Sequence, residues 1–167
     1  MDLNIPSWDD MFMNQAYQIA LKSKEPRTKL GAVIVRNKVA VSMGYNGIPR
    51  GVRDLPERYE RGKKDPWMAH AEMNAILNAS RIGASLEGCT IYTPRLPCTE
   101  KGCAIAIIQA GIVEVVLDYN WVGREADAER DELSLVMFGE AGVNVRFHPT
   151  KYLLPETVND GVICDLV

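Results

Sequence analysis

The sequence predicts a three-layer α/β/α domain in which a mixed five-stranded sheet carries helices on both faces. Helical and strand patterns alternate along the chain in the order α-β-β-α-β-α-β-α-β, without internal repeats or low-complexity tracts. The 167 residues are 47% apolar and 25% charged, a length and composition that suit one hydrophobic core. We therefore expect a single domain over residues 1–167.

The N-terminal part predicts a helix followed by a hairpin. Asp9 is suited to cap this helix. Its apolar face repeats at helical spacing through Phe12, Ala16, Ile19 and Ala20. After the turn residues KEPRT, the β-branched runs GAVIV and VAVSMG flank a short connection, which predicts two paired strands. A long polar segment, residues 51–66, follows, and loops of this length are usually functional or disordered.

The rest of the chain alternates helices with strands. Helical spacing is found in HAEMNAILNASRIG, AIAIIQAG and ERDELSLVMFGEAG. Strand patterns are found in CTIYT, VEVVLD and VNVRF. Gly83 and Gly111 come at the ends of the first two helical patterns, where a glycine commonly terminates a helix. These elements complete the predicted order.

Charge and hydropathy argue against several kinds of partner and location. The chain has no run of about 18 apolar residues, so we expect no membrane partner. The acidic start MDLNIPSWDD lacks the basic and apolar regions of a signal peptide, so we expect a cytoplasmic protein. A formal net charge of -3 gives no broad basic surface, and nucleic acid is therefore not an expected partner.

The cysteines favour metal binding or catalysis over a disulfide scaffold, because the four of them are irregularly placed in a chain with no export signal. Cys98 and Cys103 would lie about 140° apart around one straight helix. Both can reach one ion only if Cys98 precedes the helix that Cys103 begins, with Gly102 allowing the turn between them. The spacing alone leaves two unrelated buried thiols as an equally good interpretation.

The segment KDPWMAHAEMNAIL favours the metal interpretation. His70 and Glu72 lie at the start of a predicted helix, where both can face one site beyond its end. Alone, His70 would more often be a cap or a core residue, and Glu72 a first-turn glutamate that the helix dipole favours. Together with Cys98 and Cys103, His70 completes a set of one nitrogen and two sulfur ligands. Such a set leaves the fourth position of a tetrahedral zinc site open for water.

The pattern H-A-E followed by P-C-x4-C resembles the signature of zinc deaminases. Residues 17–147 resemble the cytidine/deoxycytidylate deaminase superfamily, and in particular its deoxycytidylate (dCMP) deaminase branch. The resemblance to this branch rests on three segments: PRTKLGAVIV, GYNGIPRG and HAEMNAI. The resemblance implies a cytidine-deaminase-like fold and deamination of dCMP to dUMP and ammonia, which feeds dTMP synthesis. It also implies one Zn²⁺ per chain, held by His70, Cys98 and Cys103, with Glu72 moving protons between water, ring nitrogen and departing amine.

The same resemblance suggests how the substrate is held. In the GYNGIPRG loop, Asn46 is expected to bind the deoxyribose, and Arg27, Arg50 and Arg95 are candidates for the 5′-phosphate. Without the resemblance, the loop would be an ordinary turn and each arginine a solvated surface residue. Tyr119 is expected near the base, although it would equally suit the core. The expected substrate-binding residues are Arg27, Asn46, Gly47, Ala71, Arg95 and Tyr119.

Two features depart from the family pattern. The spacing PC-x4-C is two residues longer than the usual PCxxC, so the loop beside the zinc must differ in shape. Pro94 and Arg95 stand where apolar or hydroxyl residues are usual, and a proline there would end strand pairing early. The neighbouring pocket wall, and with it the substrate preference, is expected to differ as well.

The resemblance further implies a homo-oligomer, a hexamer, activated by dCTP and inhibited by dTTP, with Mg²⁺ accompanying the nucleotide effector. Residues 51–66 and the tail 152–167 are candidates for these contacts, although the tail would also suit docking on its own domain.

Two other functions stay open. One is another zinc deaminase, acting on tRNA adenosine, a nucleoside or a free base. The acidic composition disfavours tRNA, and a nucleoside enzyme would not need the arginines. The other is a non-catalytic, zinc-stabilised binding module. A structural zinc site normally has four protein ligands, and in such a module Glu72 would have no role.

Overall fold

The computed structural model describes residues 5–119 and 128–151. The expected contact segment 152–167 lies outside them. Along the chain the elements are α1 (Trp8–Ala20), β1 (Gly31–Arg36), β2 (Val39–Tyr45), η1 (Pro56–Tyr59), η2 (Asp65–Trp67), α2 (Ala71–Arg81), β3 (Thr90–Thr93), α3 (Cys103–Gln109), β4 (Glu114–Asp118), α4 (Ala128–Glu140) and β5 (Asn144–His148). This confirms the predicted order of helices and strands. No helix in the described part of the chain is long and apolar enough to cross a bilayer.

The sheet is mixed and has the strand order β2-β1-β3-β4-β5. β1 is antiparallel to both β2 and β3, and it pairs with β3 through Ile34 and Ile91. β3, β4 and β5 run parallel to one another, and Ile91 lies opposite Val115 in the next strand. Parallel neighbours need crossover connections, which α3 and α4 provide.

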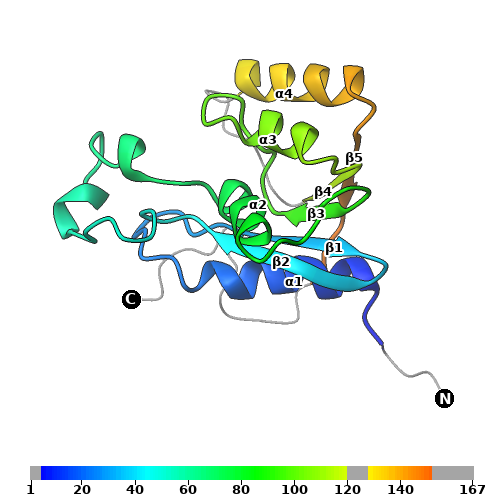
Figure 1. Cartoon of the computed structure of the whole chain (residues 1–167), viewed down its shortest axis with the longest axis horizontal. Coiled ribbons are helices and arrows are strands. Elements are labelled where there is room, and N and C mark those ends of the chain that lie inside the picture. The colour runs from blue at the N-terminus through cyan, green and yellow to red at the C-terminus, as the bar shows by residue number, and fades with distance from the viewer. Residues whose placement is uncertain (1–4, 120–127, 152–167) are drawn as a thin grey trace.

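The helices cover the two faces of the sheet unequally. Figure 1 shows α1 on one side and α2, α3 and α4 on the other. Side chains alternate along β1, so Val33 belongs to the core under α1, whereas Ile34 belongs to the larger core under the other three helices. Along β3, Tyr92 likewise belongs to the core under α1, and Ile91 belongs to the larger core. The expected three layers are confirmed, and the structure adds that each face of the sheet has its own core.

The cap of α1 differs from the prediction. Ser7, not Asp9, is the N-cap, and the Ser7 hydroxyl accepts from the Asp10 backbone N–H while the Asp10 carboxylate accepts from Ser7 in a capping box. Asp9 instead points toward the sheet, where it accepts hydrogen bonds from Arg146 and Tyr92. Both residue types cap well, so this tertiary pairing decides between them.

The polar segment 51–66 is not a featureless loop, since it contains η1 and the start of η2. Its Asp54 pairs with Lys24, and its Lys64 pairs with Glu25. These ion pairs attach the segment to the loop that follows α1.

Candidate active site

The N-terminus of α2 carries two of the predicted site residues, and β2 fixes its position. Gly44 lets the two elements approach closely, because a Cβ there would lie 2.3 Å from the Ala75 backbone nitrogen. The Asn74 and Asn78 side chains, on α2, donate to backbone carbonyls of β2, and Ser42 donates from β2 to the Ala75 carbonyl. α2 is therefore held along β2 by contacts on both elements.

His70 is the N-cap residue of α2, but its ring makes no capping hydrogen bond. The residue before it, Ala69, exchanges two backbone hydrogen bonds with Gly47, at 3.0 and 2.9 Å. This bridge sets the direction in which the chain enters the helix. The imidazole of His70 is therefore free to face the cysteines.

The loop between β3 and α3 brings the two cysteines together. Cys98 lies in the loop, and Cys103 is the first residue of α3. Gly102, between them, has φ of 71°, a left-handed conformation that glycine adopts without strain. The Cys98 carbonyl accepts the Ala104 backbone N–H at 3.0 Å, which fixes the loop on the first turn of the helix. The predicted arrangement of the two cysteines and the glycine is confirmed.

His70, Cys98 and Cys103 form a cluster whose geometry suits zinc. The Nδ1 atom of His70 lies 3.2 Å from the Cys98 Sγ and 3.6 Å from the Cys103 Sγ, and the three atoms all lie within 4.8 Å of one another. Tetrahedral zinc with bonds of about 2.3 Å to sulfur and 2.0 Å to nitrogen would set S and N about 3.5 Å apart. One imidazole and two thiols are also a donor set that zinc prefers.

The electrostatics of the cluster favour a thiolate at Cys98. The hydrogen bond from Cys103 lowers the pKa of the Cys98 thiol well below its usual value, outweighing the effect of burial, and His70 lowers it further. Thiolate is the form of cysteine that binds a metal.

Glu72 lies in the first turn of α2 and is 4% exposed. Burial raises the pKa of its carboxyl, and the attraction of His70 opposes this only in part. A buried carboxyl with a raised pKa is suited to accept and return a proton during catalysis.

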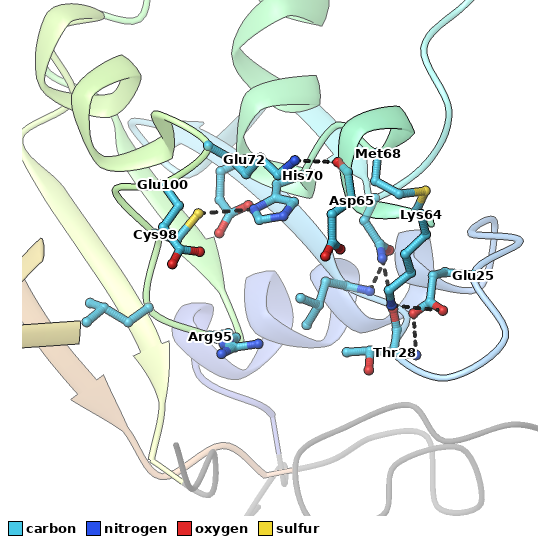
Figure 2. A pocket seen from close by; sticks show the side chains of 14 residues that line it. Glu25, Thr28, Lys64, Asp65, Met68, His70, Glu72, Arg95, Cys98 and Glu100 are labelled. Atoms are coloured by element: carbon cyan, nitrogen blue, oxygen red, sulfur yellow. Dashed lines mark hydrogen bonds and ion pairs between the residues drawn. The ribbon is translucent and has the colours of Figure 1, made fainter. Parts of the chain in front are cut away.

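Glu72 and two members of the ligand cluster, His70 and Cys98, line one cavity of about 310 Å³, within the size range of small-molecule sites. Figure 2 shows Cys98, His70 and Glu72 on one side of it and Glu25, Thr28 and Lys64 on the other, with Arg95 on the wall between. The lining residues are Glu25, Thr28, Leu30, Asn46, Lys64, Asp65, Met68, His70, Glu72, Arg95, Leu96, Cys98, Glu100 and Lys101.

Only some of the expected substrate-binding residues line this cavity. Asn46 and Arg95 do. The Asn46 amide also fixes the loop before β1, because its Oδ1 accepts from the Leu30 backbone at 2.8 Å and its Nδ2 donates to the Thr28 carbonyl at 2.8 Å. One amide N–H of Asn46 stays available for a ligand.

The roles of the other expected residues stay predictions. Arg27, Gly47 and Ala71 are not lining residues, although each is next in sequence to one. Tyr119 is not a lining residue either, and it is 68% exposed at the end of β4. Arg50 lines a separate, open hollow over β2 and α2.

Sequence reasoning missed several cavity residues, above all Glu25 and Lys64. Both occur in charged stretches, SKEP and GKKD, which give no signal that separates a cavity residue from a solvated one. Their recognition needs the tertiary ion pair between them.

Comparisons with known proteins agree with this geometry. A family model described as the cytidine and deoxycytidylate deaminase zinc-binding region matches residues 6–118. Deoxycytidylate deaminase of Mus musculus is 40% identical over 153 residues, covering 87% of this chain and 82% of the relative. The Homo sapiens deoxycytidylate deaminase is 39% identical over 147 residues, covering 83% and 78%.

Among solved structures, dCMP deaminase from the cyanophage S-TIM5 in complex with dCMP and dUMP superposes with a TM-score of 0.66 at 26% identity, covering 86% of this chain and 98% of that one. The extent of the family match and the identity to these relatives exceed what a shared fold alone requires. The chain therefore belongs to the cytidine and deoxycytidylate deaminase zinc-binding family and is a zinc-dependent deaminase.

Proposed function

We propose that this protein catalyses the hydrolytic deamination of dCMP to dUMP and ammonia. The observation that carries the proposal is the position of the buried Glu72 carboxyl, which lines the same cavity as two members of the ligand cluster, His70 and Cys98. The choice of dCMP is supported by relatives that are named deoxycytidylate deaminases and by the related phage enzyme solved with dCMP and dUMP.

In this proposal His70, Cys98 and Cys103 hold the zinc ion through Nδ1 and the two Sγ atoms. Zinc in such a three-ligand site supplies Lewis-acid chemistry that makes a water acidic enough to lose a proton near neutral pH. Glu72 is not required as a ligand, so one of its Oε atoms accepts this proton. The protonated Glu72 then donates to N3 of the cytosine ring as the water oxygen adds to C4. Glu72 afterwards accepts the proton of the new C4 hydroxyl group and passes it to the amine, and the C4–N bond breaks to release ammonia. The burial of Glu72 keeps bulk water from competing for the proton.

The first test is ammonia release by the zinc-loaded protein from dCMP, CMP, deoxycytidine, dCTP and an adenosine-containing tRNA hairpin. We expect dCMP to be turned over with the highest kcat/KM. Turnover of another member of this panel with dCMP inert would refute the proposed substrate but leave the zinc chemistry standing.

Assembly into hexamers and control by dCTP and dTTP with Mg²⁺ stay predictions from the family resemblance. The same assay tests the control directly. We expect dCTP with Mg²⁺ to raise the rate at low dCMP concentration and dTTP to lower it, while light scattering measures the assembly state under each condition.

A further inference from the structure

Lys64 is a cation of the cavity that the proposed proton transfers do not use. It lies just before η2, and its side chain is 24% exposed. Its Nζ atom lies 3.1 Å from Oε1 of Glu25, and both residues line the cavity. Lys64 therefore brings a positive charge from the segment 51–66 to the wall of the candidate active site.

Glu25 holds this lysine in place. The carboxylate is 1% exposed, and its Oε2 accepts the Thr28 backbone N–H at 2.7 Å while its Oε1 accepts that of Arg27 at 3.3 Å. These bonds fix the orientation of the carboxylate, which in turn fixes the ammonium of Lys64. An ammonium has three N–H donors, so the contact with Glu25 leaves others for a ligand.

A second lysine fixes the backbone beside Lys64. Lys101, in the longer loop between the cysteines, donates to the carbonyl of Asp65. The segment is thus attached to the metal-ligand loop at Asp65 and to the loop before β1 at Lys64. Both attachments lie at the cavity, so Lys64 keeps its position there without the substrate.

Figure 2 places Lys64 on the side of the cavity away from Cys98 and Glu72. A cytosine ring that reacts beside Glu72 would direct its sugar and phosphate toward that other side. There the structure offers the Lys64 ammonium and the remaining amide N–H of Asn46, with Arg95 on the adjoining wall. A phosphate monoester carries a charge of about -1.5 to -2 near pH 7 and binds strongly to such donors.

We propose that Lys64 binds the 5′-phosphate of the substrate and thereby selects nucleotides over nucleosides. This inference rests on the proposed function, because it assumes that the cytosine ring lies beside Glu72. It assigns to the segment 51–66 a direct part in substrate choice, through a residue that lies outside the deaminase motifs.

The test compares Lys64→Met with Lys63→Met, using dCMP and deoxycytidine as substrates. Lys63 is the adjacent lysine of the same segment and pairs with Glu60 on the surface, with its side chain 66% exposed. We expect Lys64→Met to lower kcat/KM for dCMP roughly 10- to 100-fold, the loss of a charge-assisted contact, mainly through KM. kcat/KM for deoxycytidine should change less than about threefold. Lys63→Met should alter neither value.

Lys64→Met leaves Glu25 without its counterion, and the variant risks misfolding for that reason. The double variant Glu25→Gln/Lys64→Met removes this charge imbalance and should lose the preference for dCMP in the same way. An equal loss for dCMP and deoxycytidine in this double variant would overturn the proposal, because it would make Lys64 a structural part of the wall. An unchanged preference would overturn it as well.

Calorimetric binding of dUMP and deoxyuridine separates this proposal from the proposed function. If the wild-type protein fails to deaminate dCMP, the proposed function fails, yet tighter binding of dUMP that disappears in Lys64→Met still supports the phosphate contact. Equal affinities of the wild-type protein for dUMP and deoxyuridine would overturn the role of Lys64, whatever reaction the protein catalyses.

Discussion

Glu72 combines a buried carboxyl, a raised pKa and a position two residues after a metal ligand. Glu72→Gln keeps the size of the side chain but removes its ability to accept a proton. We expect kcat to fall about 10²- to 10⁴-fold, the usual contribution of general acid-base catalysis. Zinc content, measured by mass spectrometry of the purified protein, should stay at the wild-type level. Glu140→Gln, at the end of α4, is the control and should retain full activity.

A Glu72→Gln variant that keeps most of its activity would remove Glu72 from the proton pathway. A variant that loses its zinc would instead make Glu72 part of the metal site, and the three-ligand arrangement would be wrong.

Two cysteine variants test the metal site at the level of single residues. Cys103 lies in the ligand cluster, whereas Cys89 is a free, fully buried thiol whose pKa is raised by burial. We expect Cys103→Ala to lose zinc and activity together, because two protein ligands hold the ion poorly. Cys89→Ala should keep its zinc and lose only stability, by about 1 kcal/mol. Equal zinc contents in the two variants would argue against the cluster as the metal site.

The sequence predicted the metal-binding part of the site better than the rest of the cavity. Two short motifs contain the residues of this part: His70 and Glu72 in one, Cys98 and Cys103 in the other. Within each motif, local backbone geometry such as the turn at Gly102 sets the relative positions of the side chains. Glu25 and Lys64 come from segments far apart in the chain and meet only in the folded protein. Such a pair has no local spacing from which it could be predicted.

At the scale of elements, the approach of α2 to β2 is the contact that places His70 and Glu72. A Cβ on Gly44 would lie 2.3 Å from the Ala75 nitrogen and 2.5 Å from the Ala71 carbonyl oxygen, and these backbone atoms cannot rotate away. We therefore expect Gly44→Ala to lower the free energy of unfolding by about 3 kcal/mol. It should also lower kcat, because displacement of α2 moves the catalytic carboxyl. Urea denaturation and ammonia release measure the two effects.

Gly139→Ala is the control for this substitution. Gly139 lies in α4, and a Cβ there would meet nothing within 4 Å. Alanine favours a helix over glycine by about 1 kcal/mol, so this variant should be slightly more stable than the wild type and equally active. Equal stability of the two variants would mean that α2 can move away from β2 without cost.

The order of helices and strands was predictable because apolar periodicity is a local property of the sequence. The order of the strands in the sheet was not, because β1 pairs with β3 across 54 or more residues, through contacts that no short window contains. The predicted cap of α1 was wrong for a related reason. Asp9 accepts hydrogen bonds from Arg146, on β5, and this distant contact keeps it from capping the helix. The local sequence pattern therefore predicts which helices and strands form. Contacts between distant residues decide which strands are neighbours in the sheet and where a helix begins.

At the scale of the whole molecule, contacts between the start of α1 and the last described residues hold the two ends of the described chain together. Asp9 binds Arg146, which also pairs with Glu114 on β4. Asp10 accepts from the Lys151 backbone N–H at 2.8 Å and lies 2.9 Å from Nε2 of His148. α1 is thus fixed to both β5 and the segment that follows it, and this attachment depends on two ionised carboxylates.

The attachment should make stability sensitive to acid. Burial raises the pKa of Asp10, but hydrogen bonds from Lys151, Ser7 and His148 outweigh it and lower the pKa from 3.8 to about 2. A lowered pKa in the folded state stabilises the protein above the unfolded value, and this stabilisation is lost as the pH falls from about 4 to about 2. We expect Asp10→Asn to cost about 2 kcal/mol of unfolding free energy at pH 7 and progressively less below pH 4.

Urea denaturation at pH 7, 4 and 3 measures this difference, with Asp54→Asn as the control. Asp54 also has a lowered pKa, through Lys24 and Tyr59, but it lies at the surface, where salt and water screen the pair. Its replacement should change stability little at any pH. If Asp10→Asn differs from the wild type by the same amount at pH 7 and pH 3, the contribution of Asp10 comes from packing and neutral hydrogen bonds. The ionised carboxylate would then not be what holds α1 against β5.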